Sequence, residues 1–291
     1  MDQVALIKAI REGPISGEAL AMRFGVSRAM VWKGIEALRG EGLTISAKQG
    51  YRLEGGEGFG GATLSWRCGR PVIYLPSTDS TNAIARKMAR DGDLRAVVVA
   101  DYQTAGRGRR GRIWQSSPGD NLLFSLVLTP DVPPQHAPRC VLIWAAAMAE
   151  VLGVRLKWPN DLVDEDGNKL GGILAEMEAV GEQVRFVILG VGLNVNQEHF
   201  EGLPQATSLR RLHRAPRDRA VLLAALIEAI ESADVTGGGL SGWRAVSHTL
   251  GRRVRINGIE GIAEDVRDDG ALMVGGEAVL AGDVEMVGEI T

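Results

Sequence analysis

The sequence contains few of the residues from which metal centres and disulfide frameworks are built. Its 291 residues include only two cysteines, Cys68 and Cys140, and four scattered histidines. Two cysteines without a paired spacing form neither a zinc site nor a disulfide framework. We therefore predict no metal site built from protein ligands. Each cysteine is interpreted as a buried small hydrophobe, with a reactive thiol as the alternative.

Long apolar runs and an excess of charge of one sign are also missing. No run approaches the roughly 18 apolar residues that span a bilayer, and the N-terminal residues lack the apolar core of a signal peptide. The formal net charge is only −3, which argues against a dedicated nucleic-acid coat and against attraction to membranes. We therefore expect a cytoplasmic protein without membrane association.

The chain does have enough length and apolar composition for more than one domain. A length of 291 residues with 45% hydrophobic residues predicts two or three domains. A glycine-rich stretch at 55–61 is interpreted as a flexible linker, and three glycines at 237–239 mark a second break. The sequence thus predicts an α+β multidomain protein with domains at 1–56, 63–238 and 243–291.

The N-terminal domain has the element order of a winged helix-turn-helix. Apolar residues at helical spacing predict a first helix, and Ser16 and Ser27 are placed to cap a second and a third. Two short strand-like runs, 43–47 and 50–53, follow the third helix. Helix, helix, glycine turn, helix and hairpin is the order of a winged DNA-binding module.

Three residues at the start of the third helix are candidates for DNA contact. Ser27, Arg28 and Lys33 are of the kinds that meet phosphates or base edges. Residues 1–56 carry eight basic and six acidic side chains, a net charge of only +2. A small helical module for protein interaction is therefore the alternative.

The remaining two domains differ in their patterns. In 63–238, strands are expected at 72–75, 96–100, 122–128 and 184–191, and helices at 82–90, 139–152 and 218–232, which is typical of a mixed α/β domain around a central sheet. In 243–291, a helix at 243–250 precedes strands at 254–256, 261–266, 271–274 and 284–287. The hairpin signals Asn257-Gly258 and Asp269-Gly270 favour a small SH3-like β-barrel there.

The most distinctive motif alternates four arginines with three glycines in the stretch Gly106-Arg107-Gly108-Arg109-Arg110-Gly111-Arg112. Glycines let a backbone bend closely around a ligand, and arginines present fixed forks that match phosphate oxygens. No Gly-Lys-Ser/Thr follows, so the stretch is not a P-loop. The alternative is a flexible basic loop of the kind found in RNA-binding tails. Trp114, just downstream, is either a core aromatic or a flat lid for a ligand with rings.

Two further motifs present single charged side chains near turns. Asp161 ends the run Lys157-Trp158-Pro159-Asn160-Asp161 and is suited to orienting a metal-bound ATP or a lysine. Alone it would be an ordinary turn carboxylate. Lys169 precedes Gly171-Gly172, which suggests an ammonium group over a backbone-lined pocket. The alternative is a solvated surface lysine.

Two polar or glycine-rich segments complete the set. The run Gly190-Val191-Gly192-Leu193-Asn194 lacks the spacing of a dinucleotide fingerprint. It favours a strand end from which side chains are excluded so that a ligand can approach. Upstream, Ser80, Thr81 and Asn82 precede a helical run. They form an N-cap cluster, or they grip a small polar head group at a helix N-terminus.

In this order, the motifs resemble those of the biotin–protein ligase family. The resemblance covers nearly the whole chain and is strongest between Ser77 and Asn196, and the arginine-glycine stretch is its most specific mark. With the N-terminal winged helix, the chain is similar to the bifunctional bacterial form that also represses transcription. The resemblance further implies a central domain similar in fold to class II aminoacyl-tRNA synthetases.

The reaction that this resemblance implies has two steps. The carboxylate of biotin attacks the α-phosphate of ATP, with Mg²⁺ as the partner of ATP, and pyrophosphate leaves. A lysine of the biotin carboxyl carrier protein then attacks the biotinyl-5′-AMP. The resemblance also implies binding to operator DNA and a homodimer promoted by ligand.

The resemblance assigns roles to residues by their position in the motifs. It implies catalysis by Lys169, which stabilises developing charge, by Arg109 in a loop that closes over the adenylate, and by Asp161, which orients the incoming lysine or Mg²⁺. Contacts to biotin or the adenylate are implied for Ser80, Thr81, Asn82, Gln103, Gly106, Arg107, Gly108, Arg109, Trp114, Lys169, Gly172, Gly192 and Asn194. The C-terminal run 282–287 departs from the family pattern because it lacks the arginine often found there.

Two other functions compete with this one. A ligand-sensing transcription factor without ligase activity would bind biotin or its adenylate but label no carrier. A ligase for lipoate or octanoate would share the scaffold of the central domain, but that family generally lacks this arginine-glycine stretch.

Overall fold

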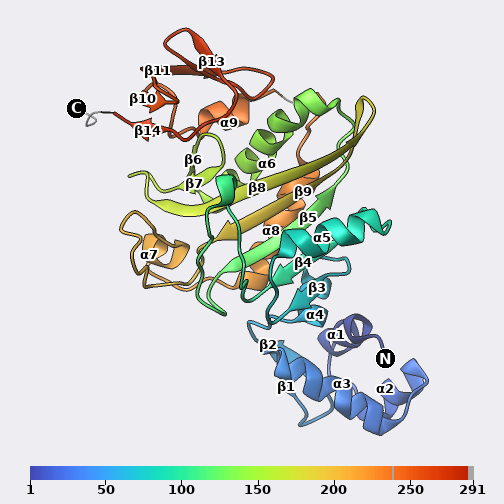
Figure 1. Cartoon of the computed structure of the whole chain (residues 1–291). Coiled ribbons are helices and arrows are strands. Elements are labelled where there is room, and N and C mark those ends of the chain that lie inside the picture. Colours follow the sequence, from blue (N-terminus) through green and yellow to red (C-terminus); the bar gives the residue numbers. More distant parts are fainter. Residues whose placement is uncertain (238, 288–291) are drawn as a thin grey trace. The chain divides into compact units, whose positions relative to one another are not determined.

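The computed structural model describes residues 1–237 and 239–287 (Figure 1). The chain divides into two compact units, Met1–Tyr74 with Asp218–Ala225, and Leu75–Arg217 with Leu226–Thr291. The predicted domain limit at residue 238 and the last residues of the predicted C-terminal domain, 288–291, lie outside the described residues.

The first unit has the predicted order of a winged helix-turn-helix. Its elements are α1 (Gln3–Arg11), α2 (Gly17–Phe24), α3 (Arg28–Gly40), β1 (Thr44–Ser46), β2 (Arg52–Gly55) and α4 (Gly61–Arg67). The predicted caps are confirmed, because Ser16 Oγ accepts a hydrogen bond from Ala19 N at 3.1 Å and Ser27 Oγ accepts one from Met30 N at 3.2 Å. The buried core of the unit includes Leu6, Ile7, Ile10, Leu20, Ile35 and Leu38.

The glycine-rich stretch 55–61 is not the flexible linker that the sequence predicts. Phe59 N donates to Glu41 O at 2.8 Å, and the Glu41 carboxylate accepts hydrogen bonds from the backbone N–H groups of Ala62 and Thr63. A Cβ atom at Gly56 would lie 2.4 Å from Gly42 O. The glycines here permit close packing of the stretch against the end of α3, and helix α4, which the sequence did not predict, follows directly.

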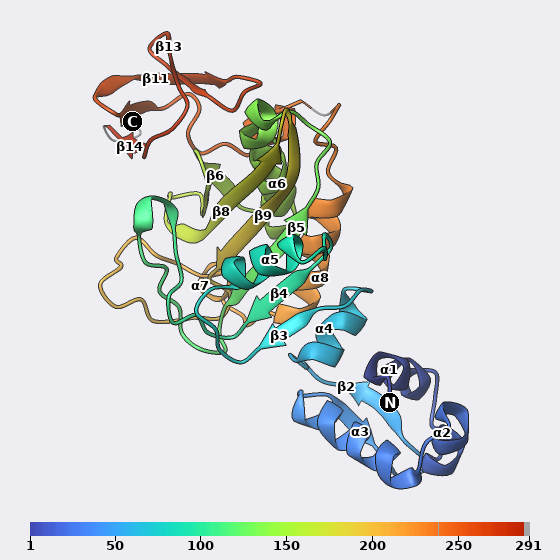
Figure 2. The ribbon, with the colours of Figure 1, turned by 45° about the vertical axis from the view of Figure 1, so that its right-hand side comes forward.

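The second unit is built on a seven-stranded sheet with the strand order β3-β4-β5-β9-β8-β7-β6 (Figure 2), in which the strands from β4 to β6 in this order pair antiparallel. Its strands are β3 (Ile73–Leu75), which crosses the boundary between the units, β4 (Val97–Ala100), β5 (Leu122–Leu128), β6 (Arg155–Lys157), β7 (Asp161–Val163), β8 (Lys169–Val180) and β9 (Gln183–Leu193). The long strands β8 and β9 pair along their length, with Gly172 opposite Gly192. This pairing brings the two glycine motifs of the sequence to the same end of the sheet.

The helices of this part of the chain follow or separate the strands. They are α5 (Thr81–Arg90), α6 (Ala137–Leu152), α7 (Leu209–His213), α8 (Arg219–Ser232), which crosses the boundary between the units, and α9 (Ser241–Ala245), with short 3₁₀ turns at Arg109–Gly111 and Pro134–His136. Helix α5 packs through Ala85 and Ala89 against Val98, Phe186 and Ile188 of the sheet. Its N-terminus lies over β9 at Gly190, where an added Cβ would come within 2.0 Å of Asn82 Oδ1.

The strands predicted in the central domain are confirmed, and so are its three predicted helices. Strand β6, strand β7 and the full length of β8 were not predicted. β6 and β7 have three residues each, too few for an alternating pattern to be visible in the sequence.

The C-terminal part of the second unit is a five-stranded antiparallel sheet of order β13-β12-β11-β10-β14. Its strands are β10 (Arg253–Ile256), β11 (Ile259–Val266), β12 (Leu272–Val274), β13 (Glu277–Val279) and β14 (Glu285–Met286). The predicted hairpin at Asn257-Gly258 is confirmed, and both residues have positive φ, 50° and 87°, as this turn requires. Within the described ranges, no helix combines the length and apolar character needed to cross a bilayer.

Candidate active site

One pocket in the second unit gathers most of the residues that the sequence singles out. The predicted residues that line it are Ser80, Thr81, Asn82, Gln103, Arg107, Gly108, Arg109, Trp114, Asp161, Lys169, Gly172 and Gly192. Residues that line it without having been predicted are Arg112, Ile113, Asn160, Ile173, Leu174, Gly190, Val191 and Asp283. Motifs that are far apart in the sequence therefore meet around a single cavity.

Two predicted residues do not line this pocket. Gly106 lies behind it, where an added Cβ would come within 2.9 Å of Trp114 O, so this glycine permits a close backbone approach. Asn194 is buried, and its Nδ2 donates to Thr207 O at 3.0 Å. Asn194 instead lines a neighbouring cavity on the other side of Trp114.

The inner end of the pocket is polar and uncharged. Thr81 N donates to Gln103 Oε1 at 2.7 Å, and Asn82 Nδ2 donates to Glu176 Oε2 at 2.8 Å. Ser80 occupies the N-cap position of α5, yet its side chain makes no capping hydrogen bond. Ser80 therefore does not cap the helix through its side chain, as the alternative interpretation of this segment would require, and it lines the pocket instead.

Ser125 supports this polar end and was missed in the sequence. Its Oγ lies 2.7 Å from Thr81 Oγ1 and 2.6 Å from Asn82 Oδ1, and all three side chains are buried. Ser125 stands in the middle of the apolar strand β5, where a single serine gives no functional signal. It fixes the side-chain positions of the two residues that face the cavity.

Glycines on β9 form one wall of the pocket. A Cβ atom at Gly190 would lie 2.0 Å from Asn82 Oδ1, and one at Gly192 would lie 2.5 Å from Trp114 Cε2. A side chain at either position would displace a residue that lines the cavity. This agrees with the prediction that side chains are excluded from this strand end.

The outer end of the pocket is charged. Lys169 Nζ donates to Asp161 Oδ1 at 2.7 Å and lies 5.8 Å from the centroid of the Trp114 ring. The side chain of Lys169 is 40% exposed and that of Asp161 is 26% exposed. Lys169 is thus a partly buried, paired ammonium group beside the cavity, not a free surface charge.

The arginine loop (106–112) forms a short hairpin over this end. Arg107 and Ile113 form an isolated antiparallel bridge, and Gly108 N donates to Arg112 O at 2.7 Å. At the tip, Arg110 and Gly111 have positive φ, 54° and 74°. The glycines allow this tight reversal, so the arginine side chains are presented from both arms of the hairpin.

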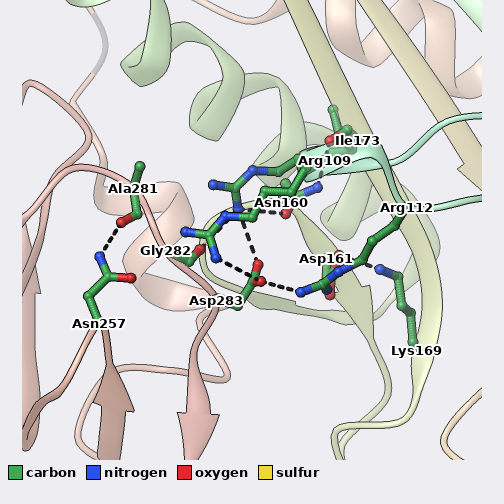
Figure 3. A network of polar contacts seen from close by, with 11 residues as sticks. Arg109, Arg112, Asn160, Asp161, Lys169, Ile173, Asn257, Ala281, Gly282 and Asp283 are labelled. Atoms are coloured by element: carbon green, nitrogen blue, oxygen red, sulfur yellow. Dashed lines mark hydrogen bonds and ion pairs between the residues drawn. The ribbon is translucent and has the colours of Figure 1, made fainter.

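Arg109 has the least exposed side chain of the three loop arginines that contact Asp283. Its Nη1 donates to Asn160 Oδ1 at 3.3 Å and to Gly282 O at 3.2 Å, and it lies 4.0 Å from Asp283 Oδ1 (Figure 3). Burial lowers the pKa of Arg109, while the carboxylate of Asp283 acts in the opposite direction. The guanidinium group remains charged, since even a lowered arginine pKa lies far above neutrality.

A second cavity adjoins the first at Trp114. Both cavities are lined by Ile113, Trp114 and Lys169, and the second is completed by residues that include Asn194, Phe200, Leu203 and Pro204. The Trp114 Nε1–H is buried and has no hydrogen-bond partner among the described residues. The ring is packed against β9 here, because a Cβ at Gly192 would lie 2.8 Å from Trp114 Nε1.

No protein-built metal centre is found among the described residues, because they contain no group of three or more His, Cys, Asp or Glu side chains suited to one. Cys140 is fully buried and Cys68 partly buried, and burial raises the pKa of the Cys140 thiol. A raised pKa makes the Cys140 thiol unreactive, in agreement with its predicted role as a small hydrophobe.

In the first unit, the three predicted DNA-binding residues differ in their surroundings. Arg28 lines a shallow groove between α3 and the hairpin, together with Trp32 and Tyr51. Lys33 is exposed on α3. Ser27 uses its hydroxyl to cap α3, so that oxygen is already engaged within the helix.

Comparison with known proteins supports the resemblance to the biotin–protein ligase family. Residues 74–194 match the biotin/lipoate A/B protein ligase family, and residues 4–55 match an HTH domain. The bifunctional ligase/repressor BirA of Bacillus subtilis is 34% identical to this chain, over 94% of this chain and 94% of its own length. The biotin–[acetyl-CoA-carboxylase] ligase of Mycobacterium tuberculosis is 38% identical over 77% of this chain and 91% of its own length.

Among solved structures, the biotin protein ligase of Aquifex aeolicus in complex with biotin and ATP has a TM-score of 0.62 and is 25% identical. The match covers 74% of this chain and 98% of that one. The chain therefore belongs to the biotin–protein ligase family. Across almost its whole length, it is similar to the bifunctional ligase/repressor members, BirA of Escherichia coli among them, at 33% identity over 91% of this chain and 89% of that one.

Proposed function

We propose that the described pocket forms biotinyl-5′-AMP and holds it until a carrier lysine arrives. The protein is a biotin–protein ligase with a repressor role, and ATP and biotin are its substrates. One observation carries the assignment of the pocket: an uncharged polar end at Thr81 and Asn82 lies opposite an end with Lys169 and Arg109. A ligand with a neutral polar head and a carboxylate tail fits this polarity.

Biotin fits the inner part of the cavity with its ureido ring toward α5. Hydroxyl and amide groups of Ser80, Thr81 and Asn82 supply donors and acceptors for a urea. Gly190 and Gly192 leave room along β9, while Ile173, Leu174 and Val191 add apolar walls. The carboxylate of the ligand then points toward Lys169.

In the adenylation step, the biotin carboxylate is the nucleophile, and the enzyme stabilises the negative charge that develops on the phosphoryl oxygens. A carboxylate oxygen of biotin forms a bond to the α-phosphorus of ATP, and the bond from that phosphorus to the leaving pyrophosphate oxygen breaks. Negative charge on the phosphoryl oxygens is stabilised by the Lys169 ammonium and the Arg109 guanidinium. The pocket therefore acts by positioning and by fixed positive charge.

The nucleotide fits the second cavity, beyond Trp114. That cavity shares Lys169 with the first, so the α-phosphate of a nucleotide placed there reaches the carboxylate end of the biotin site. The flat Trp114 ring suits packing against a heteroaromatic base. This gives Trp114 the role of a lid for a ligand with rings.

Asp161, the carboxylate beside Lys169, would hold a Mg²⁺ ion bound together with the phosphates of ATP. Sites of this kind use one or two carboxylates with phosphate oxygens and waters, which fits the few donors of this pocket, and the ion would supply neutralisation of phosphate charge. Asp161 also holds the Lys169 ammonium group and is placed to orient an incoming lysine.

Transfer completes the reaction. The amine of a lysine on the biotin carboxyl carrier protein attacks the acyl carbon of the adenylate, and AMP leaves. The test is carrier labelling: the protein, ATP, Mg²⁺ and a biotin-accepting carrier domain should yield biotin on the carrier lysine. Octanoate should not compete with biotin. Octanoylated carrier, or biotin bound without any labelling, would contradict the proposal.

Regulation of transcription involves the winged helix of the first unit. Arg28 and Lys33 on α3 supply the positive charge for operator DNA, and we infer a homodimer that forms when the adenylate is bound, as a two-fold operator requires. Gel shifts with promoter DNA are expected to show binding that strengthens when biotin and ATP are added. Equal binding with and without them would contradict this inference.

Two finer structural assignments complete the proposal. We infer that the central domain is similar in fold to class II aminoacyl-tRNA synthetases and that the C-terminal five-stranded sheet is an SH3-like barrel. The antiparallel pairing from β4 to β6 in the central sheet and throughout the C-terminal sheet supports these inferences. A cytoplasmic location agrees with ATP and a carrier protein as partners.

A further inference from the structure

The guanidinium groups of the arginine loop converge on one carboxylate, that of Asp283. Arg110 Nη1 lies 3.4 Å from Asp283 Oδ2, Arg112 Nη2 contacts the same oxygen, and Arg109 Nη1 lies 4.0 Å from Oδ1 (Figure 3). Asp283 also lines the pocket. The loop and Asp283 are separated by more than 170 residues in sequence, so this pairing is a property of the fold.

Asp283 stands on an anchored segment. Asn257 Nδ2, in the turn between β10 and β11, donates to Ala281 O at 2.6 Å. A Cβ atom at Gly282 would lie 2.5 Å from Ile256 Cγ1, so the backbone there packs directly on the end of β10. The carboxylate of Asp283 is therefore presented to the arginine loop from a fixed base.

The other carboxylate of the pocket is already engaged. Asp161 pairs with Lys169 at 2.7 Å, whereas Arg109, Arg110 and Arg112 each form an ion pair with Asp283. A carboxylate and a phosphate bind the same edge of a guanidinium fork. A loop arginine paired with Asp283 must therefore release it before it can bind a phosphate oxygen with the same donors.

We propose that Asp283 is a positioning residue that holds the arginine loop at the mouth of the pocket and is displaced by the polyphosphate of the nucleotide. The proposal rests on the proposed function, in which these arginines bind phosphate. Asp283 thereby keeps three arginines, Arg109, Arg110 and Arg112, from binding unrelated anions and sets how tightly pyrophosphate, the leaving group, is retained. Its carboxylate competes with, and repels, the phosphates that enter.

Replacing Asp283 with asparagine removes the competitor but keeps the size of the side chain. The ion pairs are partly exposed, with side-chain exposures from 25% to 66%, and such pairs are individually weak. We therefore expect Asp283→Asn to tighten binding of Mg²⁺-free inorganic pyrophosphate by roughly 3- to 10-fold. The KM for ATP should fall by a similar factor without an increase in kcat.

The experiment is titration calorimetry of the full chain with inorganic pyrophosphate in the presence of EDTA. Asp283→Glu keeps a carboxylate and should bind as the wild type does. Asp265→Asn is the matched control: it removes the same charge from an Asp265–Arg244 pair at 2.6 Å in β11, and it should leave pyrophosphate binding unchanged. Thermal unfolding checks that each variant is folded.

Two outcomes would overturn the proposal. Unchanged or weaker pyrophosphate binding in Asp283→Asn would show that Asp283 does not compete for the loop. Unchanged Mg²⁺-free pyrophosphate binding together with weaker binding of MgATP would show that Asp283 holds the metal ion instead. Failure of the proposed function would appear separately, as loss of carrier labelling by the wild-type protein.

Discussion

Replacing Lys169 with alanine is expected to slow formation of biotinyl-5′-AMP by at least roughly 100-fold. The ammonium group lies between the two cavities, 2.7 Å from Asp161 Oδ1 and beside the Trp114 ring. It is placed where the biotin carboxylate meets the α-phosphate, and negative charge develops there in the transition state. Removing it also leaves the carboxylate of Asp161 without its partner, which adds repulsion toward an anionic substrate.

The measurement is single-turnover adenylation at saturating biotin and ATP, which separates the chemical step from product release. Lys87→Ala is the matched control, because Lys87 also pairs with an aspartate, at 2.6 Å, but on the exposed surface of α5. That variant should keep the wild-type rate. Adenylation by Lys169→Ala at a near-wild-type rate would remove Lys169 from the catalytic residues.

Replacing Gly190 with alanine is expected to weaken biotin binding by roughly 5- to 150-fold. The new Cβ would lie 2.0 Å from Asn82 Oδ1, and Asn82 is held on its other side by Glu176 at 2.8 Å. The amide must therefore leave the position from which it lines the pocket, and loss of its hydrogen bond to bound biotin would cost about 1–3 kcal/mol of binding free energy. Since 1.4 kcal/mol corresponds to a factor of ten in affinity, this cost gives the expected range.

Biotin affinity measured by calorimetry checks this prediction. Gly242→Ala is the control, because a Cβ at that position meets only Ala146 Cβ at 3.9 Å, an ordinary contact, and biotin affinity should not change. The melting temperature of Gly190→Ala, measured alongside, shows whether the variant is folded. A folded Gly190→Ala variant with wild-type biotin affinity would place biotin elsewhere.

Local signals in the sequence were sufficient for much of the fold and of the site. Ser16 and Ser27 cap helices through contacts only three residues away, and Asn257-Gly258 makes a turn by itself. The arginine loop, Asp161 and Lys169 each stand out in a short window. The predicted caps and the predicted turn, which depend on neighbouring residues, were therefore confirmed, and the motifs meet around one pocket.

Features that depend on distant contacts were not predicted. Asp283 looks like any acidic residue near the C-terminus, and only the fold brings it to Arg112, 171 positions away. Ser125 is likewise ordinary until β5 places it beside Asn82. The prediction of a flexible linker at 55–61 was wrong, because a glycine-rich composition does not reveal the hydrogen bond from Phe59 N to Glu41 O.

The central claim is that one pocket makes an activated biotin from ATP and hands it to a carrier lysine. The most direct test runs carrier labelling in two stages. The protein is first incubated with biotin, ATP and Mg²⁺, and free nucleotide is then removed. Adding carrier domain without fresh ATP should give roughly one biotinylated carrier per enzyme and release AMP. No labelling from a folded preparation that binds both substrates would contradict the claim.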